Sequence, residues 1–333
     1  MRKSEPEEDE DLGALEDKTE SLSLHSKRTE RLRKKQTRKA QKNSHGSRDL
    51  LGLPYELVLE ILSYLRPSDL FQLLQTSKSL RAFILHDEAT LSRSISRWRY
   101  GCLSKCFRLP VLLSEMDPSL HPFLQTTDRQ NLLTIHKKPY QHIAPPDPTE
   151  ICTCLTCLLR WSALCLVVDF ARWQGHLERG QPIPMIQRGE QPEWNQKLIA
   201  ANANIVRKAF HSPLWHASLL ETHLNSTVKA IRRQAANKGN RRRRFRMTQE
   251  DVDSETDFFL SRSGPASYDV PYHRDNYYML EAYVPNRGWS EDIHKWLYLP
   301  ADQHDRDIDY LRHWTERQRL AAIERAQVAA HYQ

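Results

Sequence analysis

Apolar residues recur with a helical period between residues 48 and 95, and the stretch LPYELVLEILSYL is the most regular part of this pattern. Its repeating apolar positions are Leu57, Val58, Ile61, Leu62 and Leu65. Pro54 suits the first turn of a helix, where its missing N–H costs nothing, and Glu56 and Glu60 suit the amino-terminal half by the helix dipole. The pattern therefore predicts a helix with one apolar stripe.

Two shorter helices are expected to follow. Pro67 is predicted to end the first helix, because the residue before a proline avoids the helical region, and Ser68 or Asp69 to cap the second. Ser77 is predicted to cap the third. The expected inward positions are Leu70, Leu73 and Leu74 in the second helix, and Leu80, Phe83 and Ile84 in the third. Three helices this short leave much apolar surface exposed, so we expect another element or partner to cover it.

The pattern stays helical beyond residue 96. Residues 150–173 are apolar nearly all round, which predicts a central buried helix, and a membrane span fits less well at this length with Asp169 and Arg172 near its end. Residues 175–192 are rich in Gly and Pro and predict a loop. Further helices are expected over 192–239, with Pro213 at their joint, and from residue 305 onward.

No repeat with a period of 20 to 50 residues is present, which excludes solenoid and propeller architectures. Residues 1–47 contain too little apolar surface to offset the entropy of ordering, so they predict a disordered tail that is first acidic and then basic. The predicted fold class is mainly α: a disordered tail, a three-helix module and an irregular helical domain. Hydrophobic residues make up only 39% of the chain and charged residues 27%, which agrees with unpacked segments.

Basic residues are bunched at two places, and the net charge is +7. Arg33, Lys34 and Lys35 lie in the tail. The second run contains Arg241, Arg242, Arg243 and Arg244, within a predicted linker near 232–247. The first run is consistent with a nuclear-import or nucleic-acid patch, with a solvated charge run as the alternative; the second is consistent with a bipartite import signal or a phosphate-binding patch, with a plain exposed linker as the alternative.

The first dozen residues have no apolar run and no stretch reaches the ~18 to 20 apolar residues of a membrane span. We therefore expect an intracellular protein, in the nucleus, the cytoplasm or both. The six cysteines are then expected to be reduced rather than paired in disulfides.

The segment LLGLPYELVLEILSYLRPSDLFQLLQTSKSLRAFIL resembles an F-box. Several separate positions carry the resemblance, among them the Leu53-Pro54 pair, the Ile61-Leu62 step and the Ser77-Lys78 pair. It implies a domain at 48–95, between the tail at 1–47 and a substrate- or partner-binding region at 96–333. An F-box docks on the Skp adaptor of a cullin–RING ubiquitin ligase, so the resemblance implies a non-catalytic subunit that recruits a protein target.

The residues expected to contact the adaptor are Leu53, Pro54, Leu57, Ile61, Leu62, Leu65, Leu70 and Leu80. An apolar helical surface of this kind is suited to helix-on-helix binding. The alternative is that these leucines only face the chain's own helices. The alternative function is a nucleic-acid-associated or structural nuclear protein, in which the basic runs act and the F-box is secondary.

Three cysteines form the sequence CTCLTC: Cys152, Cys154 and Cys157. Zinc needs four ligands, and a histidine such as His142 could supply the fourth. The alternative is that these thiols are buried free cysteines on an apolar helix. Because no clean fourth ligand is evident, no metal and no cofactor is predicted, and zinc binding stays open.

No catalytic centre is evident. His273 and Asp275 have the spacing of a non-haem iron site, with His304 or His313 as the distal ligand, but the sequence lacks the alternating strands that hold such a site. Nucleophile-elbow, P-loop and dinucleotide motifs are also missing. Tyr277, Tyr278 and Tyr283 could form a binding face, although a place in the core is the expectation.

Overall fold

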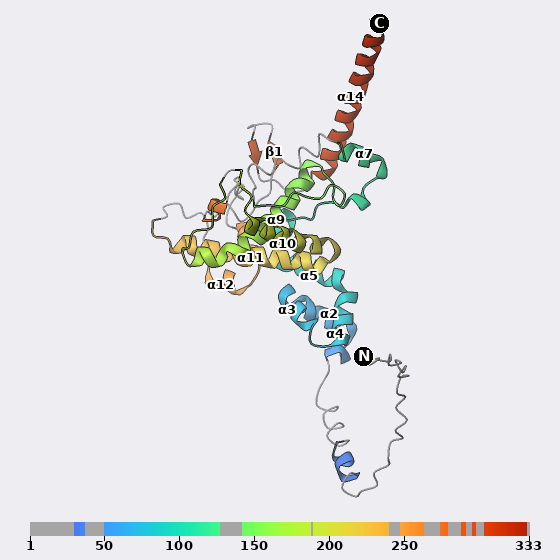
Figure 1. The fold of residues 1–333 in the computed structure, drawn as a ribbon. Coiled ribbons are helices and arrows are strands. Elements are labelled where there is room, and N and C mark those ends of the chain that lie inside the picture. Colours follow the sequence, from blue (N-terminus) through green and yellow to red (C-terminus); the bar gives the residue numbers. More distant parts are fainter. Residues whose placement is uncertain are drawn as a thin grey trace, which may run out of the picture. The chain divides into compact units, whose positions relative to one another are not determined.

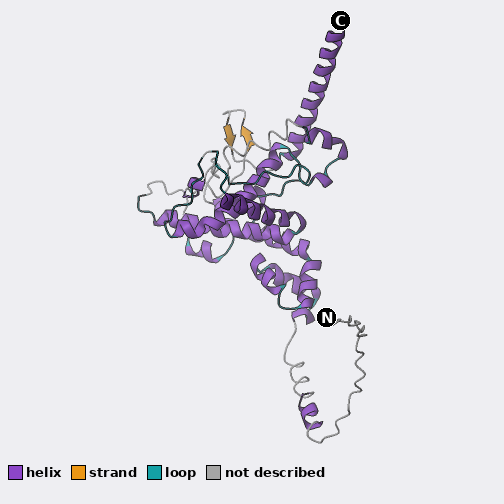
Figure 2. Cartoon of the chain, in the orientation of Figure 1, coloured by secondary structure: helices purple, strands orange, loops and turns teal. Residues whose placement is uncertain are grey.

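The computed structural model describes residues 30–36, 50–126, 142–187, 189–239, 247–262, 274–278, 288–290, 295–297 and 303–331. The chain divides into two compact units, Met1–Pro54 and Tyr55–Gln333. In the first unit, residues 30–36 form a helix and Leu50–Gly52 form the short 3-10 helix η1. The rest of the predicted disordered tail lies outside the described residues. Among the described residues helices account for nearly all regular structure, which confirms the mainly α fold class (Figures 1 and 2).

The second unit begins with four consecutive helices: α2 (Tyr55–Ser63), α3 (Pro67–Leu73), α4 (Lys78–His86) and α5 (Glu88–Arg99). The hydroxyl of Ser77 accepts the Leu80 N–H at 3.2 Å and caps α4 as predicted. The predicted cap of α3 is wrong. Pro67 is the first residue of α3 and Arg66 is the cap, because proline is tolerated where the helix needs no N–H donor.

Short elements connect α5 to the central helices. They are α6 (Leu103–Cys106), the 3-10 helices η2 (Leu113–Glu115) and η3 (Pro118–Leu120), and α7 (His121–Leu124). An isolated antiparallel bridge pairs Leu112 with Ile151, so the chain before η2 lies beside the chain before the next long helix.

Three long helices form the core of this unit: α9 (Leu155–Glu178), α10 (Glu193–His211) and α11 (Pro213–Ala236). They pack against one another, and α11 also packs against α3 and α5 (Figure 1). Most of α9 is buried, in agreement with the all-round apolar pattern. The loop predicted from residue 175 is too early, because α9 continues to Glu178 with Gly175 inside it. No helix in the described part of the chain is long and apolar enough to cross a membrane.

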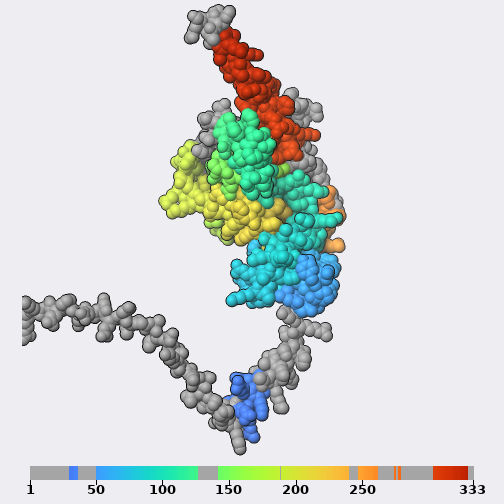
Figure 3. Space-filling view, turned by 90° about the vertical axis from the view of Figure 1, so that its right-hand side faces the viewer, coloured from blue at the N-terminus to red at the C-terminus, as the bar shows by residue number. Residues whose placement is uncertain are grey.

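The remaining elements are short except for the last. They are α12 (Gln249–Asp253), α13 (Phe258–Arg262), η5 (Arg274–Tyr278), the antiparallel strands β1 (Gly288–Ser290) and β2 (Lys295–Leu297), and α14 (His304–His331). Ile308 and Leu311, near the start of α14, are buried, whereas its later apolar residues are exposed. Figure 3 shows the later turns of α14, in red, clear of the other coloured elements on this face. Only the base of this helix therefore contributes to the core.

Candidate functional site

Helix α2 carries apolar residues on two sides. Val58 and Leu62 are buried at 1% and 0% exposure, and α2 packs against α5. Leu57 and Ile61, one turn apart, are 46% and 42% exposed. Apolar side chains spaced at i and i+4 on a helix surface form a continuous contact strip. The helix therefore presents an outer apolar strip while its inner strip builds the core.

The eight predicted adaptor contacts divide by burial. Leu53, Pro54, Leu57 and Ile61 are exposed, Leu65 and Leu80 are half-buried, and Leu62 and Leu70 are fully buried. The helical period explains the burial of Leu62, because consecutive residues of a helix are about 100° apart, so Leu62 faces α5 while Ile61 faces outward. Leu62 and Leu70 therefore belong to the core beneath the exposed residues and are not themselves accessible to a partner in this conformation.

The start of α3 is attached to α11 by a buried carboxylate. Glu221 of α11 accepts the Ser68 N–H at 2.9 Å and the Ser68 hydroxyl at 2.6 Å. Arg66 donates to Asp69 from Nε at 2.9 Å and from Nη2 at 3.0 Å, which lowers the pKa of the Asp69 carboxyl. The free N–H groups of the first turn of α3 are thus satisfied partly by its own side chains and partly by α11.

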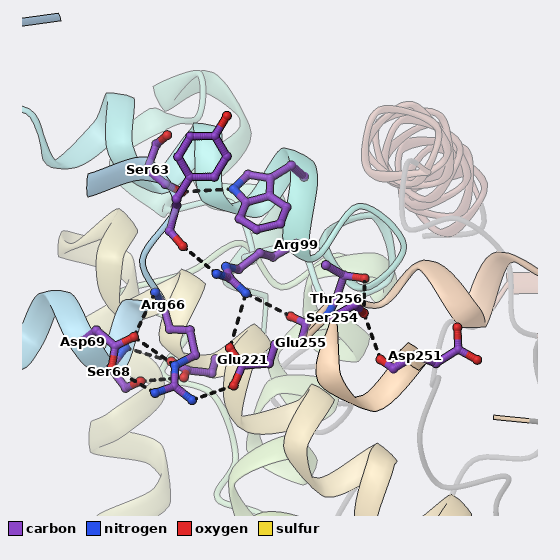
Figure 4. A network of polar contacts seen from close by, with 12 residues as sticks. Ser63, Arg66, Ser68, Asp69, Arg99, Glu221, Asp251, Ser254, Glu255 and Thr256 are labelled. Atoms are coloured by element: carbon purple, nitrogen blue, oxygen red, sulfur yellow. Dashed lines mark hydrogen bonds and ion pairs between the residues drawn. The ribbon is translucent and has the colours of Figure 1, made fainter. Parts of the chain in front are cut away.

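The end of α2 is capped from α5 (Figure 4). The Trp98 ring N–H donates to the Ser63 carbonyl at 3.0 Å, and Arg99 Nη2 donates to the Tyr64 carbonyl at 2.6 Å. Glu255, in the turn after α12, pairs with Arg66 at 2.9 Å and with Arg99 at 3.6 Å. Charge-assisted bonds of this kind are roughly twice as strong as neutral ones, so they fix the inner side of α2 and α3.

A second connection lies at the junction of α4 and α5. Glu88 accepts the Leu214 N–H at 3.0 Å and the Ser212 hydroxyl, so it completes the capping of α11. The Tyr55 hydroxyl donates to Asp87 at 2.5 Å, and this hydrogen bond raises the Tyr55 pKa. Helices α2 to α5 therefore form a module whose inner side is held by α11 and whose outer side keeps an apolar strip.

These helices define an all-α module of four consecutive helices. The F-box-like family model matches residues 50–97, so the chain contains an F-box-like domain. The match covers far less than half of the chain. Comparisons of the chain with curated proteins and with solved structures give no match.

The cysteines of the CTCLTC sequence meet a histidine from the far end of the chain. The ligand atoms of Cys152, Cys154, Cys157 and His304 all lie within 4.8 Å of one another. Burial raises the pKa of the Cys154 thiol well above its usual range, whereas hydrogen bonds from Cys154 and Cys157 lower that of Cys152. His142, the histidine considered from the sequence, is not part of this group.

Among the residues that the structure describes, the other sequence candidates are not brought together. Arg33, Lys34 and Lys35 are exposed on the helix at 30–36, and Arg241 to Arg244 lie outside the described residues, as does His273. Of the two possible distal iron ligands, His304 lies among the cysteines and His313 is exposed on α14. Tyr277 is buried in the core as expected, Tyr278 is exposed, and Tyr283 lies outside the described residues.

A hollow of about 720 Å³ opens beside Trp98, the residue that donates to the Ser63 carbonyl. Its lining includes the cationic side chains Arg93, Arg97 and Lys105 and the exposed rings of Trp98 and Phe258. The sequence pattern did not indicate this hollow, because residues 93–105 and 257–261 are brought together only by the tertiary fold.

Proposed function

We propose that this protein is a substrate-recognition subunit of an SCF-type cullin–RING ubiquitin ligase. The F-box-like domain would bind a Skp-type adaptor, and the region from residue 96 onward would bind an unidentified protein target. The polypeptide would be non-catalytic, with ubiquitin transfer performed by other subunits through proximity. The intracellular location expected from the sequence, in the nucleus or the cytoplasm, is compatible with this role.

The observation that supports adaptor binding most strongly is the outer apolar strip of α2. Leu57 and Ile61 remain exposed although this module is held by hydrogen bonds and ion pairs on its inner side. Fully burying a leucine or isoleucine side chain is worth about 1.5–3 kcal/mol, so a partner that covers both gains several kcal/mol before the costs of association.

The region from residue 96 onward is proposed to bind the target. The Ser68–Glu221 and Leu214–Glu88 hydrogen bonds join the F-box-like domain to the amino-terminal half of α11, so a target on the helical region would be kept at a defined distance from the adaptor. The hollow lined by Arg93, Arg97 and Lys105 is a concave surface suited to an acidic segment of a target.

Co-purification with a Skp-type adaptor tests the proposal. Leu57→Asp with Ile61→Asp, and separately Leu53→Ala with Pro54→Ala, should reduce adaptor recovery, because they remove apolar contact without changing the core. Met185→Asp is a matched control, since Met185 is also apolar and exposed but lies outside this module. Equal recovery of the adaptor by wild type and by both double variants would overturn the proposal.

Salt separates this function from the nucleic-acid alternative. Adaptor binding through apolar side chains should survive an increase from ~50 to ~200 mM salt, whereas binding through phosphates would fall by orders of magnitude. Retention of nucleic acid that disappears with salt, without any adaptor recovery, would favour the alternative.

A further inference from the structure

A group of one imidazole and three thiols lies where the start of α9 meets the start of α14. Cys154 Sγ and Cys157 Sγ each lie 3.3 Å from His304 Nδ1, and Cys152 Sγ completes a group whose atoms are all within 4.8 Å. Zinc–sulfur bonds of about 2.3 Å and zinc–nitrogen bonds of about 2.0–2.1 Å give a tetrahedron with edges of roughly 3.6–3.8 Å. The group therefore has the size of a four-coordinate zinc site.

The backbone aims all three sulfurs at one point. Cys152 lies in an extended segment, where its N–H donates to the Val111 carbonyl at 2.9 Å. Cys154 is the N-cap of α9 and Cys157 lies in its first turn. The free N–H groups and the dipole at a helix start favour negative charge, which suits a thiolate. The extended segment at Cys152 and the first turn of α9 thus place the three sulfurs close together while α9 stays a regular helix.

Backbone N–H groups also point at the sulfurs. The Cys154 N–H donates to Cys152 Sγ at 3.4 Å, the Cys157 N–H to Cys154 Sγ at 3.3 Å, and the Val111 N–H to Cys157 Sγ at 3.4 Å. Such outer hydrogen bonds orient metal ligands and are common around metal sites. Each of the three cysteine sulfurs therefore has a backbone donor in addition to its place facing the imidazole.

Simple core packing explains less of this arrangement. The three cysteines belong to an apolar cluster with Ile308 and Leu311, and buried free cysteine is common in such surroundings. A thiol–imidazole hydrogen bond accounts for one such contact, because Nδ1 offers one lone pair or one N–H, but not for His304 Nδ1 lying 3.3 Å from two sulfurs at once. A cation shared by all four atoms does account for both contacts.

The chemistry of the ligands selects the metal. Three thiolates and one imidazole are soft to borderline donors that suit zinc rather than magnesium or calcium, and four protein ligands leave no open position for a reacting water. We propose that Cys152, Cys154, Cys157 and His304 bind one structural zinc ion that fastens the base of α14 to the start of α9. This proposal does not depend on the proposed function.

Neighbouring contacts agree with a structural role at this joint. Asp307, one turn beyond the start of α14, accepts the Thr156 N–H at 2.6 Å and so caps the first turn of α9. Ile308 and Leu311 are buried against the same cluster. To these contacts the zinc ion would add a crosslink between Cys157 and His304, which are 147 positions apart.

The test is the zinc content of the full chain, purified with reduced thiols and no chelator and measured by elemental mass spectrometry. One zinc per chain is expected in the wild type. Cys154→Ser and His304→Ala should bring the content near zero, while His304→Cys, which supplies a fourth thiolate, should keep one zinc. His313→Ala, on the same helix, and Cys106→Ser are controls that should also keep it.

Cobalt(II) provides a second measurement that does not depend on how the variants fold. Exchange of zinc for cobalt in the wild type should give the visible d–d and thiolate charge-transfer absorption of a tetrahedral site. Three results with folded wild type would overturn the proposal. They are a protein that retains no zinc after incubation with zinc, a protein that shows no cobalt bands, and a disulfide bond among the three cysteines. A full zinc content that persists in both Cys154→Ser and His304→Ala would overturn it too.

Discussion

Asp169, in the middle of α9, is completely buried and receives hydrogen bonds from η5. Arg274 donates to it from Nε at 3.0 Å and from Nη2 at 3.1 Å, and the Tyr277 hydroxyl donates at 2.7 Å. The Arg274 side chain is itself only 5% exposed. Asp169→Asn would keep the shape of the side chain but leave the guanidinium buried without its opposite charge.

The expected loss follows from this burial. Removing one partner of a buried ion pair costs about 3–5 kcal/mol, because the remaining charge is out of water and uncompensated. For a domain of 150–250 residues each kcal/mol corresponds to a Tm change of about 2–4 °C, so the Tm should fall by roughly 6–20 °C. The Asn195 side chain, which accepts from Arg274 Nη2 at 3.0 Å, would offset only a small part of this loss.

Calorimetry or urea unfolding of the wild type, Asp169→Asn, Arg274→Met and the double variant Asp169→Leu/Arg274→Met would measure the effect. The double variant should lose less than the sum of the single losses, because no buried charge is left unpaired. Glu193→Gln is the matched control, since its ion pair with Lys197 is exposed on α10 and should contribute at most about 1 kcal/mol. A loss below about 1 kcal/mol for Asp169→Asn would refute the reasoning.

Three further predictions concern the F-box-like domain. Leu62→Ala should reduce the free energy of unfolding by about 2–5 kcal/mol, whereas Leu57→Ala should change it by less than about 0.5 kcal/mol, as urea titration would show. Ser77→Ala should cost about 1 kcal/mol in the same assay and speed hydrogen exchange at the start of α4; unchanged exchange there would contradict the cap. Because Arg66 lowers the Asp69 pKa, the stability that this carboxylate contributes is present above the unfolded pKa of about 3.9 and is lost as the pH falls through the folded value. The difference in free energy of unfolding between wild type and Asp69→Asn should therefore shrink below about pH 4. A difference that grows as the pH falls would contradict the prediction.

Local patterns predicted most of the helices. The 3.6-residue period located α2, the all-round apolar run located the buried helix α9, and Ser77 was identified as a cap from its position alone. Errors arose where two signals competed. Pro67 can stop one helix or start the next, and Gly175 weakens a helix without ending it when the surrounding packing is strong enough.

The site was predictable only in part. The period placed Leu57 and Leu62 in one apolar group, but the division into an outer and an inner strip depends on where α5 packs. The attachment of α3 through Glu221 gave no sequence signal beyond an acidic residue among apolar helical positions. His304 was considered for a different site, because the sequence does not show that α14 starts beside Cys154.

The sequence separation between Cys157 and His304 also affects the order in which the ligands appear during synthesis of the chain. At a synthesis rate of about 5–20 residues per second, the 147 positions between them take roughly 7–30 s to be made. During that interval the three sulfurs already exist while the imidazole does not, and the rest of α9, α10 and α11 is made. A nascent chain that stops before His304 would hold three adjacent thiols open to oxidation or to a chaperone, so completion of this cluster reports that translation has reached α14.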